Sequence, residues 1–210
     1  MSDDRSIPQK IVEAPGLLLG QMERAVGRRY YRRYFANRPA HTAVDANTIS
    51  ARMQDADHIL FLCLGNVCRS PFAAQYAATH LDTVDVASAG LSPLQGIDSP
   101  ANAVRTARTF GVDLSEHTSR GVPATALQET DMVFVMDFCN YYLLSTRHPA
   151  ARDRAHFLGA LNPERTTPVI PDPHGGDPET FRETYAAISR TIDRLAAIMC
   201  NEQNLQPDPR

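Results

Sequence analysis

The residues that could carry out chemistry lie in Cys63–Pro71, where a cysteine and an arginine stand six positions apart. A short apolar run of strand length, Ile59–Leu62, precedes this stretch, and helical periodicity follows it. Serine suits the N-cap of a helix and proline suits its first position, so we expect Ser70 to cap a helix that begins at Pro71. The loop 64–68 then presents backbone N–H groups at a helix N-terminus.

Such a loop binds oxyanions, because unpaired N–H groups and the helix dipole both favour negative charge. The same field stabilises the thiolate form of a cysteine at the base of the loop, which makes Cys63 a candidate nucleophile. The planar guanidinium of Arg69 could hold two phosphate oxygens at once. The stretch therefore indicates a cysteine site that handles phosphate.

Alternating strands and helices follow from residue 59 onward. We expect strands at 59–62, 84–88, 132–136 and 155–158, and helices at 71–80, 100–110, 140–145 and 179–199. Strands separated by helices predict an α/β fold, a three-layer sandwich with a central four-stranded parallel sheet and right-handed crossovers. In such a sheet ligands bind beyond the carboxyl ends of the strands, where the cysteine loop falls.

A basic N-terminal extension, residues 1–57, precedes this pattern. Residues 24–38 hold six arginines and no acidic residue, and apolar side chains repeat at near-helical spacing across 16–36. With a second helical piece at 44–56, the extension is expected to be largely helical. Its basic helix could contact the catalytic part of the chain, a second subunit or an acidic partner, and nucleic acid or an anionic membrane surface stays open. Residues 201–210 are expected to form a polar tail.

The composition is that of an ordinary globular chain, with 43% hydrophobic and 21% charged residues and a net charge of −3. Residues 1–58 carry nine Lys and Arg against seven Asp and Glu, whereas residues 59–210 carry twelve against seventeen. No apolar run approaches the roughly 18 residues that span a bilayer, and no signal-peptide core is evident, so we expect a cytoplasmic location. Four cysteines are too few for a disulfide scaffold, although an oxidative bond between Cys63 and Cys68 is conceivable.

The segment Cys63–Pro71 reads Cys-Leu-Gly-Asn-Val-Cys-Arg-Ser-Pro, and a distant Asp172 stands between two prolines. With the order of elements, these residues resemble the low-molecular-weight protein tyrosine phosphatases, and the resemblance assigns the catalytic domain to residues 58–200. It implies hydrolysis of phosphotyrosine, in a protein, or of another aryl phosphate monoester. It implies no cofactor and no metal.

The resemblance also implies roles for individual residues. Cys63 would attack phosphorus and form a cysteinyl phosphate, while Arg69 and the loop amides hold the phosphate oxygens. Asp172 would protonate the leaving oxygen and then activate water. Substrate binding would fall to the loop residues Leu64, Gly65, Asn66, Val67, Cys68 and Ser70.

A supporting set follows from the same resemblance. Asn66 would hold the loop in an unusual backbone conformation, which asparagine tolerates. Ser70 would donate a hydrogen bond to the thiolate and make it a better leaving group. Ser88 and His117 would brace Asn66.

The walls of the site differ from the family pattern. Where many members carry an aromatic pair after Asp-Pro, this chain has His174 and Gly175, and Leu94 stands where another aromatic is common. Stacking walls help to select a flat phosphotyrosine ring, so the strength of the tyrosine preference stays open.

Other polar residues are interpreted as structural. We expect Arg120 and Asp137 to form structural ion pairs. The remaining candidate metal ligands, His148, His156 and His174, show no metal-ligand spacing.

Two other functions stay open. Arsenate reductases resemble this fold and loop, but their chemistry needs two further cysteines near the first, and only Cys139 lies in roughly the right region. A phosphoprotein-binding module without turnover is the other alternative, and the intact Cys63, Arg69 and Asp172 argue against it.

Overall fold

The structure, a computed structural model, describes residues 45–92, 95–162, 164 and 167–203. The chain divides into two units, residues 1–39 and 40–210, and all of the described residues belong to the second unit. The expectations for a basic helix at 16–36 and for Leu94 lie outside the described residues.

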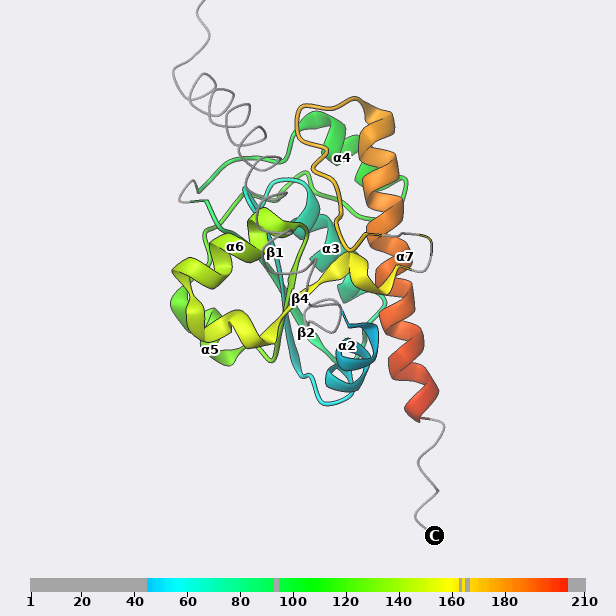
Figure 1. The fold of residues 1–210 in the computed structure, drawn as a ribbon. Coiled ribbons are helices and arrows are strands. Elements are labelled where there is room, and N and C mark those ends of the chain that lie inside the picture. Colours follow the sequence, from blue (N-terminus) through cyan, green and yellow to red (C-terminus); the bar gives the residue numbers. More distant parts are fainter. Residues whose placement is uncertain (1–44, 93–94, 163, 165–166, 204–210) are drawn as a thin grey trace, which may run out of the picture. The chain divides into compact units, whose positions relative to one another are not determined.

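A four-stranded parallel sheet forms the centre of this unit (Figure 1). Its strands are β1 (His58–Cys63), β2 (Asp85–Gly90), β3 (Met132–Val135) and β4 (Ala155–Phe157). They lie in the order β2-β1-β3-β4 and all pair in parallel, which confirms the sheet expected from the sequence. Strand β1 is central and is buried at every position after its first, as the continuous apolar run at 59–62 predicts.

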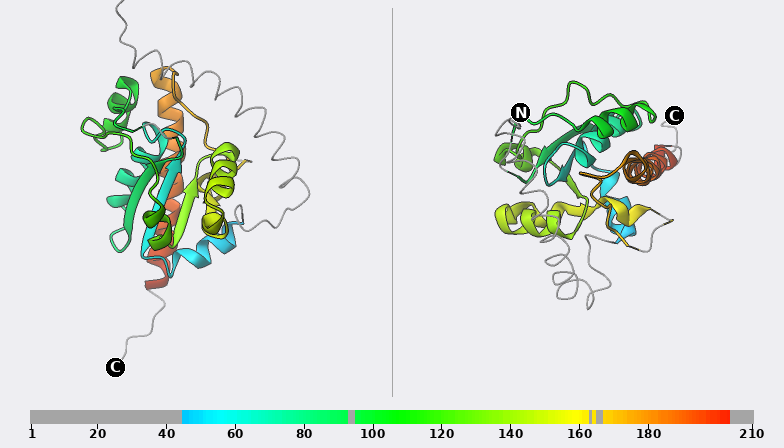
Figure 2. Two further views of the ribbon diagram at one scale, coloured as in Figure 1. Left: turned by 90° about the vertical axis from the view of Figure 1, so that its left-hand side faces the viewer. Right: turned by 90° about the horizontal axis from the view of Figure 1, so that it is seen from above.

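Helices cover the sheet on both sides, with α4 on one side and α6 on the other when the unit is seen from above (Figure 2). The α-helices are α2 (Ala46–Met53), α3 (Arg69–Ala78), α4 (Ala101–Arg108), α5 (Ala124–Glu129), α6 (Phe138–Arg147) and α7 (Pro178–Gln203). Two short 3₁₀ helices, η2 (Pro149–Arg154) and η3 (Leu158–Leu161), flank β4. Helices α5, η2 and η3 were not predicted from the sequence, and α7 continues three residues into the expected polar tail.

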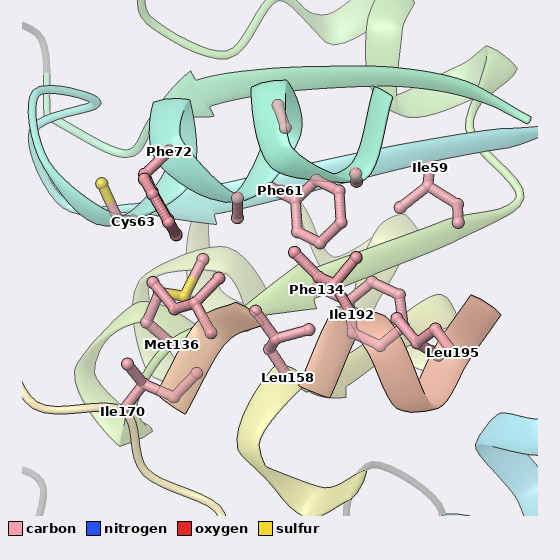
Figure 3. Packing of buried hydrophobic residues seen from close by; sticks show 14 of the residues in the cluster. Ile59, Phe61, Cys63, Phe72, Phe134, Met136, Leu158, Ile170, Ile192 and Leu195 are labelled. Carbon is pink, nitrogen blue, oxygen red and sulfur yellow. The ribbon is translucent and has the colours of Figure 1, made fainter. Parts of the chain in front are cut away.

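The core lies between the sheet and helices α3 and α7. Phe61 of β1 stacks on Phe134 of β3, and Phe72 of α3 stacks on Tyr185 of α7 with ring centroids 3.9 Å apart. Complete burial of one such side chain stabilises the fold by roughly 1.5–3 kcal/mol. Figure 3 shows that Cys63 lies at the end of β1 beside Phe72, so the packed core fixes the start of the cysteine loop.

Helix α2, which the sequence placed in the extension, packs into this same core. Ile49 and Met53 are fully buried members of the hydrophobic cluster, and Arg52 donates a 2.6 Å hydrogen bond to the Asp153 carbonyl at η2. We therefore propose that the domain begins ahead of α2, near residue 40, rather than at residue 58.

Candidate active site

The loop of the predicted motif connects β1 to α3 at the carboxyl edge of the sheet. Helix α3 begins at Arg69, and its N-cap is Cys68, whose side chain makes no capping bond. The expectation that Ser70 caps a helix starting at Pro71 is therefore wrong. The Ser70 hydroxyl lies in the first turn and donates instead to the sulfur of Cys63, at 3.1 Å.

Asn66 occupies the centre of the loop in a left-handed backbone conformation, with φ of 53°. This conformation directs the Asn66 backbone N–H at the sulfur of Cys63, at 3.2 Å. Its side-chain amide donates to the hydroxyls of Ser70 and Ser88, each at 3.0 Å. Few residues other than glycine adopt positive φ readily, and asparagine is the commonest of these because its side chain can bond locally.

The segment 117–120, which follows α4, makes further hydrogen bonds to this network. The Nε2 atom of His117 donates to the Asn66 carbonyl at 2.8 Å, and the backbone N–H of Arg120 donates to the Asn66 side-chain oxygen at 3.0 Å. The Nε of Arg120 also donates to the Ser88 carbonyl at 3.1 Å. Thus Ser88 and His117 both contact Asn66, and Arg120 joins the same network and forms no ion pair with another residue that the structure describes.

The end of β2 holds the other side of the loop. Gly90 pairs with Cys63 in the sheet register, and a Cβ added at Gly90 would lie 3.1 Å from the Leu64 carbonyl oxygen and 3.2 Å from Asn66 Cβ. The next residue, Leu91, donates from its N–H to the Cys63 carbonyl at 3.0 Å. Only glycine lets β2 approach the loop this closely.

Arg69 is almost completely buried, at 1% exposed, and lies between two carboxylates. Its Nη1 donates to Asp137 at 2.6 Å and to the Ile170 carbonyl at 3.1 Å, and its Nη2 donates to Asp172 at 2.7 Å. Asp137 is also the N-cap of α6, where its other oxygen accepts the Asn140 N–H at 2.8 Å. Asp137 was expected to form a structural pair, and its partner is the arginine of the phosphate loop itself.

A sequence signal for Asp137 existed. It directly follows a buried strand and precedes a helix, and the carboxyl ends of parallel strands share one edge of the sheet.

Asp172 comes to this edge from far along the chain. The Ile170 N–H donates to the Met136 carbonyl at 2.8 Å, which joins the aspartate segment to the end of β3. The His174 N–H donates to Asp172 at 3.3 Å, and the His174 ring lies 3.9 Å from the sulfur of Cys68. The structure thus brings Cys63, Arg69 and Asp172 to one edge of the sheet.

Comparisons with known proteins agree with this arrangement. Residues 58–206 match the family described as low molecular weight phosphotyrosine protein phosphatase. The chain belongs to this family. A probable low molecular weight protein-tyrosine-phosphatase, EpsP, of Ralstonia nicotianae is 32% identical over 135 residues, which are 64% of this chain and 90% of that protein.

Solved structures show the same likeness. Wzb of Vibrio vulnificus, in complex with benzylphosphonate, is 28% identical with a TM-score of 0.62, and the match covers 68% of this chain and 98% of Wzb. The YwlE arginine phosphatase from Geobacillus stearothermophilus is also 28% identical, with a TM-score of 0.65 over 73% of this chain and 99% of YwlE. This protein is therefore a protein tyrosine phosphatase, and the arsenate reductase alternative gains no support.

Burial changes the pKa of two groups at the loop of this phosphatase, one in the loop and one that contacts it. Burial raises the pKa of the Cys68 thiol well above its ordinary value, and the charge of Asp172 raises it further. Burial also raises the pKa of the Tyr185 hydroxyl, so it stays protonated and donates to the Cys68 carbonyl at 3.4 Å. All four cysteines are reduced in the structure, and a regulatory bond between Cys63 and Cys68 stays a prediction.

Metal binding and a membrane-spanning helix find no support in the described residues. No group of three or more His, Cys, Asp or Glu side chains among these residues could hold a metal ion. None of the helices in the described part of the chain is both long and apolar enough to cross a membrane.

Proposed function

We propose that this phosphatase hydrolyses phosphotyrosine in two displacements, with Cys63 as the nucleophile. The observation that supports this best is the pair of hydrogen bonds that the Cys63 sulfur accepts from the Asn66 N–H and the Ser70 hydroxyl. Both donors stabilise negative charge on sulfur, before attack and again when the thiolate leaves.

In the first displacement the Cys63 sulfur forms a bond to phosphorus as the bond to the tyrosyl oxygen breaks. Arg69 and the loop amides hold the three non-bridging oxygens while charge moves toward the leaving group. The carboxyl of Asp172 gives its proton to that oxygen. Since Asp172 pairs with Arg69 in the structure, the incoming phosphate must replace the carboxylate on at least one guanidinium nitrogen.

In the second displacement water attacks the cysteinyl phosphate and the carboxylate of Asp172 takes a proton from it. The bond between sulfur and phosphorus breaks, and the thiolate leaves with the Ser70 hydroxyl bonded to it. The products are tyrosine and inorganic phosphate. Asp137 keeps Arg69 oriented in both steps through its 2.6 Å contact.

The decisive experiment compares wild type, Cys63→Ser and Asp172→Asn on p-nitrophenyl phosphate and on a phosphotyrosine peptide. We expect no turnover by Cys63→Ser. We expect Asp172→Asn to lose roughly 10²–10⁴-fold in kcat on the peptide, the usual contribution of a general acid, and less on p-nitrophenyl phosphate, whose leaving group needs less protonation.

The matched control is Cys139→Ser, because Cys139 lies outside the loop, at the start of α6. Its turnover should equal that of the wild type. Phosphate release that survives Cys63→Ser would overturn the proposal.

Phosphoarginine is a second candidate substrate, because the YwlE arginine phosphatase shares the fold of nearly its whole length with this chain. A phosphoarginine peptide of matched sequence belongs in the same assay. If kcat/KM for phosphoarginine exceeds that for phosphotyrosine, the same two displacements act on a phosphorus–nitrogen bond.

The basic N-terminal segment and the location of the protein stay predictions. We propose that residues 1–39 recruit an acidic phosphoprotein. Their removal should then raise KM for a protein substrate and leave KM for p-nitrophenyl phosphate unchanged, whereas equal effects would remove the idea. A cytoplasmic location likewise stays a prediction from the sequence.

A further inference from the structure

Arg147 places a positive charge close to the phosphate loop without touching it. It is the last residue of α6, and its Nη1 donates to the Leu91 carbonyl at 2.5 Å. The N–H of Leu91 donates to the Cys63 carbonyl at 3.0 Å. One residue of backbone therefore separates the guanidinium of Arg147 from the nucleophile's own peptide.

Arg120 holds the same stretch of chain a few residues earlier, through its Nε bond to the Ser88 carbonyl at 3.1 Å. Both arginines are exposed residues. Each uses one guanidinium nitrogen to fix its position, and no hydrogen bond joins its other guanidinium nitrogens to a residue that the structure describes.

Neither arginine forms an ion pair with a carboxylate among the residues that the structure describes. Asp98 is bridged to Thr118, two residues before Arg120, and Glu116 precedes Arg120 by four residues, yet neither acid forms an ion pair with Arg120 or Arg147. Some other exposed arginines pair with acids, as Arg182 does with Glu179, and what sets Arg120 and Arg147 apart is their position beside the loop. Residues 59–210 carry seventeen acidic side chains against twelve basic ones, so two cations beside the active loop that pair with no carboxylate in the described part of the chain run against the charge of the domain.

We propose that Arg120 and Arg147 bind acidic side chains that flank the phosphotyrosine of the substrate. This inference rests on the proposed function and narrows its substrate class to phosphotyrosine within an acidic sequence. A peptide whose phosphate occupies the loop advances about 3.3 Å per residue, so side chains two or three positions away reach the Leu91 segment. Guanidinium suits this role, because its planar fork pairs with a carboxylate through two bonds.

The test uses two peptides that share a central phosphotyrosine, one with three Glu on each side and one with Gln at the same six positions. The readout is the ratio of kcat/KM for the acidic peptide to that for the neutral peptide, measured at low salt. Three variants are compared with wild type: Arg147→Gln, Arg147→Lys and Arg152→Gln. Arg152 is the matched control, an exposed arginine on η2 beside Asp153.

We expect wild type to prefer the acidic peptide and Arg147→Gln to lower the ratio about threefold to fivefold, the size of one exposed ion pair. Arg147→Lys keeps the charge and should keep most of the preference, while Arg152→Gln should equal wild type. The preference should fall as salt is raised to 0.5 M, because exposed charges are screened.

Three outcomes would overturn the inference. These are a wild type without preference, equal ratios for Arg147→Gln and Arg152→Gln, and equal losses by Arg147→Gln on both peptides, which would make Arg147 a clamp for the loop alone. An enzyme without turnover on p-nitrophenyl phosphate would instead count against the proposed function.

Discussion

In the proposed mechanism the phosphate loop and the aspartate segment carry the two halves of the chemistry, and they are held in opposite ways. The loop is buried at Asn66 and at Ser70, and it is bonded to β2, to the segment 117–120 and to α7. The aspartate segment, residues 171–177, is mostly exposed, and its side chain Asp172 is 28% exposed.

The backbone of the aspartate segment is also held by fewer contacts than the loop. Gly175 has φ of 77° with open space around it, and few bonds hold the segment, among them the one from Asn102 to the Gly176 carbonyl at 3.0 Å. The loop must present fixed donors to a fixed anion, whereas the acid must meet leaving groups of different shape and leave Arg69 when phosphate arrives. Rigid support therefore belongs to anion binding, and looser support belongs to proton transfer.

Among the changes that test this comparison, the largest effect should come from Asn66→Ala, which removes the centre of the rigid region. The change loses hydrogen bonds to Ser70, Ser88 and Arg120 and leaves alanine at positive φ. At about 1 kcal/mol for each of the three hydrogen bonds and for the strained backbone, kcat/KM should fall roughly 1000-fold. Asn66→Gly relieves only the backbone strain, so its kcat/KM should lie between those of wild type and Asn66→Ala. A wild-type kcat/KM in Asn66→Ala would contradict the role of the network.

Gly90→Ala tests whether the close approach of β2 shapes the loop. The new Cβ would meet backbone atoms of Leu64 and Gly65 at 3.1–3.2 Å, so the loop must shift. Overpacking of about 1–2 kcal/mol predicts a loss of about tenfold in kcat/KM and a weaker inhibition constant for inorganic phosphate.

The control for this change is Gly121→Ala, at the bridge partner of Gly90. There the added Cβ meets the end of the flexible Gln95 side chain at 3.4 Å. Its kinetics should stay within twofold of wild type, because a flexible side chain can move away from the added methyl group. Wild-type kinetics in both variants would show that the loop tolerates displacement.

Gly175→Ala probes the looser region. Alanine at φ of 77° is strained by about 1 kcal/mol, so kcat on a phosphotyrosine peptide should fall about fivefold while the inhibition constant of phosphate stays unchanged. Gly111→Ala has the same φ and the same open surroundings beyond α4, so it should cost the same stability without changing kcat. A weaker phosphate constant in Gly175→Ala would mean that the two regions are not separable.

The smallest effect concerns the end of the aspartate segment, where Asp177 accepts the Thr180 N–H at 2.8 Å ahead of α7. The bonds from Thr180 lower the pKa of Asp177 below its ordinary 3.8. This stabilisation is complete above the ordinary value and is lost as pH falls through the lower pKa of the folded protein. The Tm of Asp177→Asn should lie below that of wild type at pH 7, and the difference should shrink as pH falls below the ordinary 3.8; a constant difference would contradict the assignment.

Much of the fold and of the site could be predicted from the sequence. The nine contiguous residues from Cys63 onward and the Asp172 between prolines identified the chemistry, and the alternation of strands and helices predicted the parallel sheet. The predicted ends of the strands lie within two residues of the observed ends, because apolar runs of strand length mark buried strands directly. The short helix α5 and the two 3₁₀ helices were missed, since segments of four to six residues carry too few turns for a periodic signal.

The sequence by itself determined which groups are proposed to act, because a nucleophile, an anion clamp and a donor loop can all be specified within a few consecutive residues. Only the tertiary structure decided what positions them. Asp137 contacts Arg69 across 68 residues, Arg120 reaches Asn66 across 54, and Tyr185 reaches the Cys68 carbonyl across 117. Such contacts depend on strand order and on the shared carboxyl edge of the sheet, and local residue patterns record neither.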